Sequence, residues 1–93
     1  MRRSEIYKQA MDLWGCAVQI DIALEEMNEL SIAILKFRRN PEQLAIKKEA
    51  IEQEIADVEI MMEQLRMIFD TKTISKIKTR KLRRLQKRIE MES

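Results

Sequence analysis

Two short acidic motifs are the residues most able to do chemistry in this chain of 93 residues. The first reads EExxE and spans residues 25–29, and the second reads ExxD and spans residues 54–57. Side chains three or four residues apart lie on one face of an α-helix. Each motif therefore predicts a row of carboxylates along one helix. The candidate ligands for a cation are Glu26, Glu29, Glu54 and Asp57.

Four carboxylates gathered in one place repel one another and lose hydration unless a cation neutralises them. The chain has no histidine and one cysteine, Cys16, so the ligand atoms would all be oxygen. Such a set favours Mg²⁺, with Mn²⁺ as a substitute, over Zn²⁺ or copper. Because Mg²⁺ commonly takes phosphate oxygens, a phosphate compound is the expected substrate. The alternative is that these acids lie on solvated helix faces, as most acidic helix residues do.

The elements that position these acids are bounded by few helix breakers. Gly15 ends a first short helix, and Asn40-Pro41 separates two long ones, with Asn40 as the expected N-cap and Pro41 as the first helical residue. A polar break over residues 70–73, with Thr73 as the expected cap, precedes a last helix. The predicted helices cover about 4–14, 16–39, 41–70 and 73–90.

The two long helices, joined by a short turn, must form an antiparallel hairpin. With the turn near residue 40, residues that face each other have numbers totalling about 80. This register predicts that Glu26 lies near Glu54 and that Glu29 lies near residue 51. Carboxylates of both helices would then meet within about one turn.

Helical-wheel positions indicate which faces are buried. In the third helix one apolar stripe is the expected core, and Glu54 and Asp57 fall within or beside the apolar arc. The second helix is apolar around most of its circumference, which predicts burial on more than one face. The expected core stripe of the third helix consists of Leu44, Ile51, Ile55, Val58, Met62, Leu65 and Phe69.

Composition and pattern together predict an all-α fold. We expect a single domain over residues 1–93, an antiparallel bundle of about four helices, completed by oligomerisation because so short a chain buries little surface alone. The longest uninterrupted apolar run, residues 32–35, is far too short to span a bilayer, and no signal peptide is evident. A soluble protein of the cytoplasm, with no membrane partner, is expected.

Charge is distributed unequally along the chain. Residues 1–71 carry 9 basic and 14 acidic side chains, whereas residues 72–93 carry 9 basic and 2 acidic ones. In the last helix Ile74, Ile77, Leu82, Leu85 and Ile89 form an apolar face that would dock on the body of the protein. A basic ridge could bind phosphates, or the helix could instead be solubilising or bind RNA. The ridge comprises Lys78, Lys81, Arg84 and Arg88.

Taken together, these motifs resemble the MazG-like all-α nucleoside triphosphate pyrophosphohydrolases, in particular their compact single-domain bacterial and phage members. The resemblance covers nearly the whole chain. Its carriers are Trp14-Gly15, Gln19, Glu25-Glu26, Glu29-Leu30, the run Glu54-Ile55-Ala56-Asp57-Val58-Glu59, and Lys81-Leu82 with Arg84-Leu85 and Arg88-Ile89.

The resemblance implies hydrolysis of a nucleoside triphosphate to the monophosphate and pyrophosphate. It places the Mg²⁺ ligands at Glu26, Glu29, Glu54 and Asp57. Glu25 falls on the acid that assists metal binding or orients the attacking water, and we expect it to take the proton. The family assembles as homodimers or as tetramers made of two dimers.

The same resemblance suggests roles for residues outside the acidic motifs. Lys78, Lys81, Arg84 and Arg88 would contact the phosphates, from the same subunit or across a subunit boundary. Gln19 by hydrogen bonding and Trp14 by stacking are candidates for the nucleoside. Each also has a structural alternative, because Trp14 could anchor a core and Gln19 could hydrogen-bond within the bundle.

The main competing interpretation is a non-enzymatic helical module whose basic last helix binds nucleic acid. Such a module needs no divalent metal, and its affinity falls steeply with salt. A third alternative is a degenerate family member that binds nucleotides without turnover, which the presence of all five motif acids disfavours. We expect nucleotide hydrolysis and do not expect a nucleic-acid partner. Base and sugar preference and the biological role are not indicated by the sequence.

Overall fold

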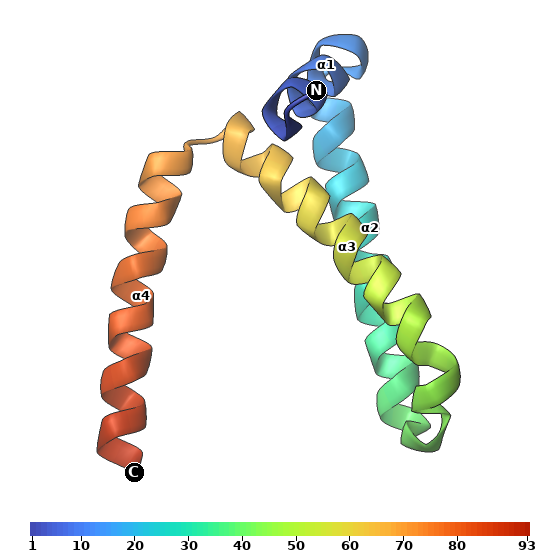
Figure 1. Ribbon diagram of the computed structural model, residues 1–93, viewed down its shortest axis with the longest axis vertical. Helices are drawn as coiled ribbons and strands as arrows, with labels where there is room; N and C mark the ends of the chain where they lie inside the picture. The colour runs from blue at the N-terminus through green and yellow to red at the C-terminus, as the bar shows by residue number, and fades with distance from the viewer.

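The computed structural model describes residues 1–93 and contains helices but no strands (Figure 1). The all-α prediction is therefore confirmed. No helix is long and apolar enough to cross a membrane. The elements are α1 (Arg3–Trp14), α2 (Cys16–Arg39), the 3₁₀ turn η1 (Pro41–Gln43), α3 (Leu44–Ile68) and α4 (Thr71–Glu92).

Helices α2 and α3 form the expected antiparallel hairpin, which is the body of the structure (Figure 1). Helix α2 ends at Arg39 because Pro41 cannot continue it, and three basic residues in its last turn suit the negative end of the helix dipole. The prediction that Asn40 caps a helix starting at Pro41 is wrong. Asn40 makes no side-chain cap, and α3 starts at Leu44 after η1.

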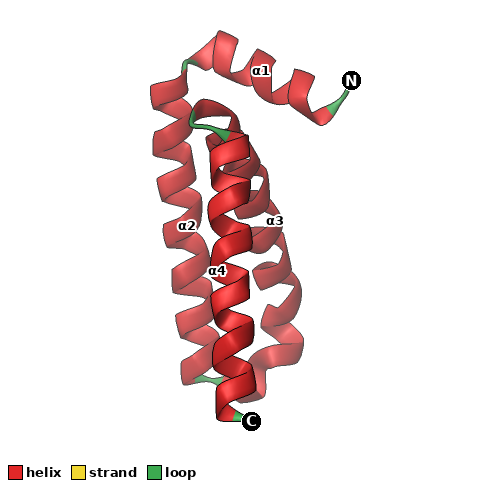
Figure 2. Cartoon of the chain, turned by 90° about the vertical axis from the view of Figure 1, so that its left-hand side faces the viewer, coloured by secondary structure: helices red, strands yellow, loops and turns green.

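Helix α1 lies across the open end of the hairpin (Figure 2). The chain turns sharply at Gly15, which has a φ of 93°, a left-handed value that favours glycine. Tyr7 is buried against α3 and donates a hydrogen bond to Glu63. Arg3 pairs with the same carboxylate at 3.2 Å. These contacts hold α1 on α3 and close one end of the hairpin.

Helix α4 leaves the end of α3 in a separate direction (Figure 1). Asp70, not Thr73 as predicted, caps α4 by accepting from the backbone N–H groups of Lys72 and Thr73. Hydrogen bonds to the Thr73 side chain and to these N–H groups lower the pKa of Asp70. Across the joint, Arg66 donates to the Thr71 carbonyl at 3.3 Å.

Beyond its first turns, where Ile74 and Ile77 are half-buried, the hydrophobic face of α4 does not dock on the body of this chain, contrary to prediction. No residue of α4 is buried, and Leu82, Leu85 and Ile89 are each at least half exposed. The joint after Asp70 directs the helix away from α2 and α3. A single chain therefore leaves this face without a partner.

The core of the hairpin is narrow and differs from the predicted stripe. The face of α3 that meets α2 repeats every three or four residues through Ile51, Glu54, Val58 and Met61. A two-helix interface selects such a repeat, of about 3.5 residues, rather than the whole apolar arc of a wheel. The expected core residues that remain exposed are Leu44, Ile55, Met62 and Phe69.

The chain is less compact than a typical domain of its length. Its radius of gyration is 16.7 Å, whereas about 12 Å is expected for 93 residues. Its accessible surface is 7861 Å², against roughly 5,700 Å² for a compact monomer of this mass. The second face of α2 is correspondingly exposed at Leu24, Ile32 and Leu35. Only one face of α2 is covered within one chain.

Candidate metal centre and adjoining groove

The register of the hairpin decides which carboxylates meet. Gln19 of α2 donates a hydrogen bond from Nε2 to Oε1 of Gln64 in α3, at 2.7 Å, and both side chains are buried. The residue numbers of Gln19 and Gln64 total 83. The numbers of Arg39, the last residue of α2, and Leu44, the first residue of α3, also total 83. The predicted total of 80 is wrong by about one turn, because η1 lengthens the connection. Glu29 consequently lies opposite Glu54 rather than residue 51.

Three acids from the two helices converge at the middle of the hairpin. One carboxylate oxygen each of Glu26, Glu29 and Glu54 lies within 4.8 Å of the other two. Asp57 is exposed and is not part of this triad, but its charge acts on both Glu26 and Glu54. Glu25 is exposed on α2, next to Glu26 in sequence. The triad thus contains three of the four proposed metal ligands.

The triad holds charge that the protein itself does not neutralise. Oε2 of Glu26 and Oε2 of Glu54 are both buried and lack a hydrogen-bond donor. Burial raises the pKa of Glu26, and the charges of Glu29, Asp57, Glu54 and Glu25 raise it further. Burial likewise raises the pKa of Glu54, and the nearby charges of Glu29 and Asp57 raise it further. Buried carboxylate oxygens without a donor are stabilised by binding a proton or a cation.

A small, hard cation fits this donor set. Mg²⁺ binds oxygen at about 2.1 Å, so two ligands on opposite sides of the ion are about 4.2 Å apart. The oxygens of the triad are within 4.8 Å of one another, so small side-chain movements suffice to reach that geometry. All donors are carboxylates, which suits Mg²⁺ or Mn²⁺. Glu26, Glu29 and Glu54 could therefore hold the ion, with Asp57 close enough to contribute charge.

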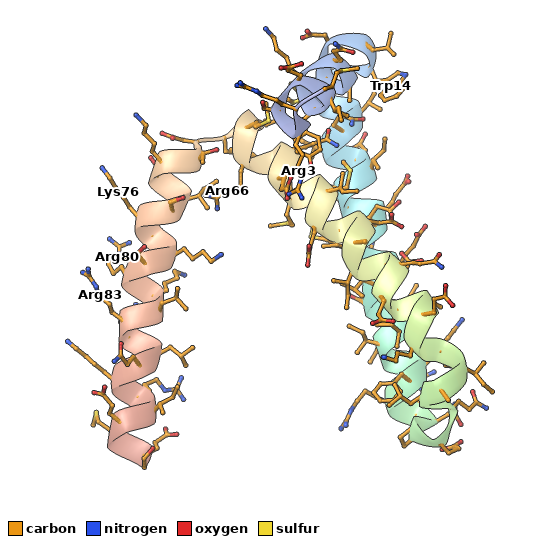
Figure 3. All side chains as sticks on the ribbon, in the orientation of Figure 1. Arg3, Trp14, Arg66, Lys76, Arg80 and Arg83 are labelled. Atoms are coloured by element: carbon orange, nitrogen blue, oxygen red, sulfur yellow. The ribbon has the colours of Figure 1, made fainter.

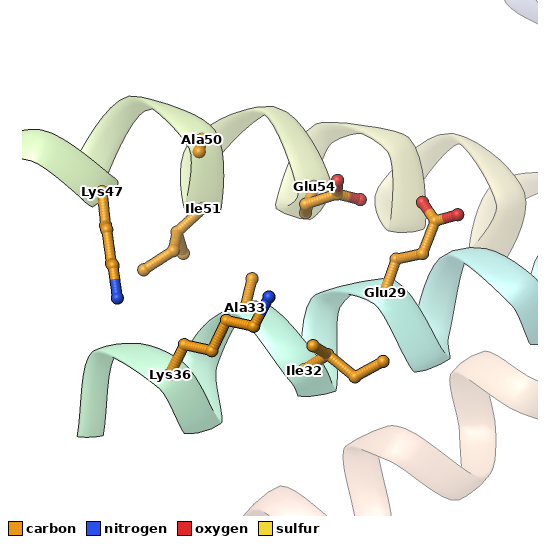
Figure 4. Close-up of a pocket in the computed structure, with 8 residues that line it drawn as sticks. All are labelled: Glu29, Ile32, Ala33, Lys36, Lys47, Ala50, Ile51 and Glu54. Atoms are coloured by element: carbon orange, nitrogen blue, oxygen red, sulfur yellow. The ribbon is translucent and has the colours of Figure 1, made fainter. Parts of the chain in front are cut away.

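A groove of about 360 Å³ between α2 and α3 begins at the triad (Figure 4). Glu29 and Glu54 line one end, and Lys36 and Lys47 line the other. Its remaining lining residues are small or aliphatic: Ile32, Ala33, Ala50 and Ile51.

The two lysines of the groove were not identified from the sequence. A signal was available, because Lys36 follows Glu29 by seven residues and Lys47 precedes Glu54 by seven. Seven residues make about two helical turns and return to the same face. A helical wheel drawn for the whole hairpin, rather than for each motif, would have placed these cations beside the acids.

The two residues proposed for the nucleoside lie in different surroundings. Gln19 is two turns before Glu26 and is buried, with its amide nitrogen bonded to Gln64 and its oxygen unpartnered. It therefore makes the within-bundle contact that was the structural alternative. Trp14 is 58% exposed at the corner between α1 and α2 and points outward (Figure 3). It is not a core anchor of this chain.

The basic ridge of the last helix lies outside the groove of its own chain. Lys78, Lys81, Arg84 and Arg88 are all exposed on α4, and none lines the space between α2 and α3. Lys78 instead borders an apolar hollow formed where α3 meets α4, beside Phe69 and Ile77. These side chains are not gathered at the acids of the chain.

The hairpin therefore combines a carboxylate cluster suited to a divalent cation with a neighbouring groove that carries two cationic side chains. This arrangement can bind an anion that is coordinated by a metal at one end. Comparison with protein-family models, with characterised proteins and with solved structures gave no match.

Proposed function

We propose that this protein is a Mg²⁺-dependent nucleoside triphosphate pyrophosphohydrolase. The observation that supports it is the triad Glu26, Glu29 and Glu54, which has two buried, unpartnered carboxylate oxygens and opens onto a groove with two lysines. The resemblance of the acidic motifs to the MazG-like enzymes points to the same chemistry. The reaction is (d)NTP + H₂O → (d)NMP + pyrophosphate.

In the proposed reaction the oxygen of water forms a bond to the α-phosphorus, and the bond from that phosphorus to the α–β bridging oxygen breaks. Glu25, exposed beside the triad, accepts the proton of the attacking water. Glu26, Glu29 and Glu54, with Asp57 beside them, would hold the Mg²⁺. When bound, Mg²⁺ offsets the charge on the phosphoryl oxygens and lowers the pKa of water. The displaced pyrophosphate leaves with the electron pair of the broken bond.

We propose further that two or more copies assemble. A single chain exposes about 2,000 Å² more surface than a compact protein of its mass, and obligate homodimers bury roughly 2,000–5,000 Å² in total. The exposed apolar faces of α2, α3 and α4 would then be covered. In such an assembly Lys78, Lys81, Arg84 and Arg88 approach the phosphates from a neighbouring copy. The exposed free thiol of Cys16 suits a reducing cytosol, where the substrate is found.

The decisive test is release of pyrophosphate from a panel of NTPs and dNTPs, with Mg²⁺ and with EDTA. Wild type should turn over only with Mg²⁺, and Glu26→Gln should lose nearly all activity because a charged ligand becomes neutral. Glu29→Gln should behave in the same way. Glu49→Gln serves as the matched control, since Glu49 is an exposed acid of α3 outside the groove. Metal-independent turnover, or an active Glu26→Gln variant, would refute the proposal.

A second candidate function is nucleic-acid binding by the outer face of α4. Lys76, Arg80 and Arg83 lie on that face with Ser75 and Thr79 around a shallow hollow, and they point away from the hairpin (Figure 3). None of these three cations pairs with a carboxylate. A nucleic-acid ligand would show log K falling with log salt at a slope of about −0.9 per phosphate contacted. Binding of that kind, unaffected by Glu26→Gln and without any nucleotide turnover, would favour this function.

A further inference from the structure

The groove beside the carboxylates is organised in levels along the hairpin. Glu29 and Glu54 form the first level, and Lys36 and Lys47 form the last (Figure 4). Two pairs lie between them, Ile32 with Ile51 and Ala33 with Ala50. Within each level the two residue numbers total 83, so the partners face each other in the register set by Gln19 and Gln64. Between the charged levels Ala33 and Ala50 are small, whereas the side chain of Ile51 extends from α3 toward α2 (Figure 4). The groove thus runs from paired anions to paired cations.

The lysines have no carboxylate partner of their own. The ion pairs of the chain join Arg3 to Glu63 and Arg88 to Glu92, and neither involves Lys36 or Lys47. Lys47 is half-buried in the hairpin, which makes an unpaired ammonium group costly in the absence of an anion. Both side chains point into the groove from opposite helices (Figure 4). Their positions therefore suit a ligand that carries negative charge into the groove.

The distance between the levels indicates how long that ligand is. The lysines are seven residues, or about 10 Å along the helix axis, from the nearest acid. Side chains of helices lean toward the N-terminus, which brings the ammonium group of Lys36 back toward Glu29. The same tendency carries Lys47 away from Glu54, because Glu54 follows Lys47 in α3. A single phosphate held at the carboxylates through a cation lies about two helical turns from the backbone of Lys36 and of Lys47. A chain of phosphates extended along the groove can contact both ends.

We propose that Lys36 and Lys47 form a subsite for the terminal phosphates of the substrate, which makes the groove selective for a polyphosphate chain over a monophosphate. This inference rests on the proposed function for the identity of the substrate. Lysine suits the role because its compact ammonium group binds phosphate oxygens as a point charge. In the proposed reaction the same two side chains hold the β- and γ-phosphates, which leave together as pyrophosphate. The phosphate contacts at this end then come from the hairpin itself and not only from α4.

The test compares Lys36→Met, Lys47→Met and the double variant with Lys48→Met. Lys48 is the matched control, because it is the next residue of α3, is exposed and does not line the groove. Calorimetry in Mn²⁺ would measure binding of inorganic tripolyphosphate, of an α,β-methylene nucleoside triphosphate and of a nucleoside monophosphate. A hydrogen bond to a charged group contributes about 1.5–3 kcal/mol, so each groove lysine should account for roughly 10- to 100-fold in tripolyphosphate affinity. Monophosphate affinity should be unchanged.

Three results would overturn the proposal. The first is unchanged tripolyphosphate affinity in the double variant, and the second is an equal loss in Lys48→Met. The third is tighter Mn²⁺ binding with unchanged discrimination between tripolyphosphate and monophosphate, because the lysines would then serve only to balance the carboxylates. Where the double variant fails to fold, Lys36→Gln and Lys47→Gln singly, with Lys36→Arg and Lys47→Arg as charge-retaining rescues, give the same comparison.

The binding assay separates this subsite from the reaction. Tripolyphosphate and the methylene analogue report on the lysines without hydrolysis at the α-phosphate. Lysine-dependent tripolyphosphate binding without turnover of any nucleotide would leave the subsite standing and remove the proposed reaction. Mg²⁺-dependent turnover with full tripolyphosphate affinity in the double variant would do the opposite.

Discussion

Replacing Glu26 by glutamine should reverse the order of stability between wild type and variant when a divalent cation is added. Without metal, burial and neighbouring acids disfavour the charged form of Glu26, as its raised pKa indicates. The Glu26→Gln change removes this charge and keeps the volume and shape of the side chain. In EDTA near pH 7.5, the variant should therefore melt at or above the temperature of wild type.

With metal the order changes, because an ion that binds only the folded protein stabilises it by mass action. Mg²⁺ at 100 times its dissociation constant contributes about 2.7 kcal/mol. Loss of one of the three converging oxygens should weaken binding by at least the roughly 10- to 100-fold typical of lost supporting residues. At the same Mg²⁺ concentration the variant then gains about 0.4–1.4 kcal/mol. Each kcal/mol shifts the melting temperature of a domain of this length by about 4–8 °C.

The assay is thermal unfolding followed by circular dichroism, at one protein concentration, in EDTA and across a Mg²⁺ or Mn²⁺ series. Protein concentration must be constant because association also shifts the melting temperature. Glu49→Gln, which removes an exposed acid of α3, should respond to metal as wild type does. An equal metal-induced shift in wild type and Glu26→Gln would show that the triad is not the metal site.

Three other predictions concern stability. In EDTA, lowering the pH from 7.5 toward 4.5 should stabilise wild type more than Glu26→Gln. The folded pKa values of Glu26 and Glu54 are raised, so protonation of these groups stabilises the folded state, and this contribution is lost as the pH rises through the folded pKa. Equal pH profiles of the two proteins in urea unfolding would contradict this prediction. Gln64→Leu should cost about 1–3 kcal/mol by leaving the buried amide of Gln19 without its acceptor, and Gln19→Leu combined with Gln64→Leu should regain much of that loss in the same measurement. Asp70→Ala should fray the first turn of α4, which would be measured as faster amide exchange of Lys72 and Thr73. The same fraying should occur in wild type as the pH falls below about 3.8 through the lowered pKa of Asp70. Amide exchange that is unchanged both in the variant and at low pH would exclude the cap.

The sequence was sufficient to predict the helices and the hairpin. Gly15 and Pro41 break helices for reasons of backbone geometry alone, so the boundaries at Trp14 and Arg39 follow directly from local chemistry. The first residue of α3 was harder to predict from the sequence, because a proline is equally compatible with the first turn of an α-helix and with the 3₁₀ turn that the chain adopts. That difference displaced the register by about one turn.

The candidate site was predictable in its acids and not in its cations. Spacing alone placed Glu26, Glu29 and Glu54 on facing sides of the hairpin, and their role as metal ligands stays a prediction. Lys36 and Lys47 lie beside the acids only because of the pairing register between α2 and α3, and that register depends on the length of η1. The apolar wheel of α3 also misidentified Ile55 and Met62 as core, because a wheel shows which face is apolar but not which partner is present to cover it.

The protruding α4 has a consequence for the lifetime of the protein in a cell. A helix of 22 residues with no fully buried residue has little tertiary packing to stabilise it, and this one carries nine lysines and arginines, each a site for trypsin-like cleavage. If copies assemble as proposed, a copy without a partner would be cleaved in α4, whereas a copy whose α4 is covered would persist. The amount of protein in the cell would then increase more than in proportion to its rate of synthesis, because the fraction of copies that escapes degradation increases with concentration.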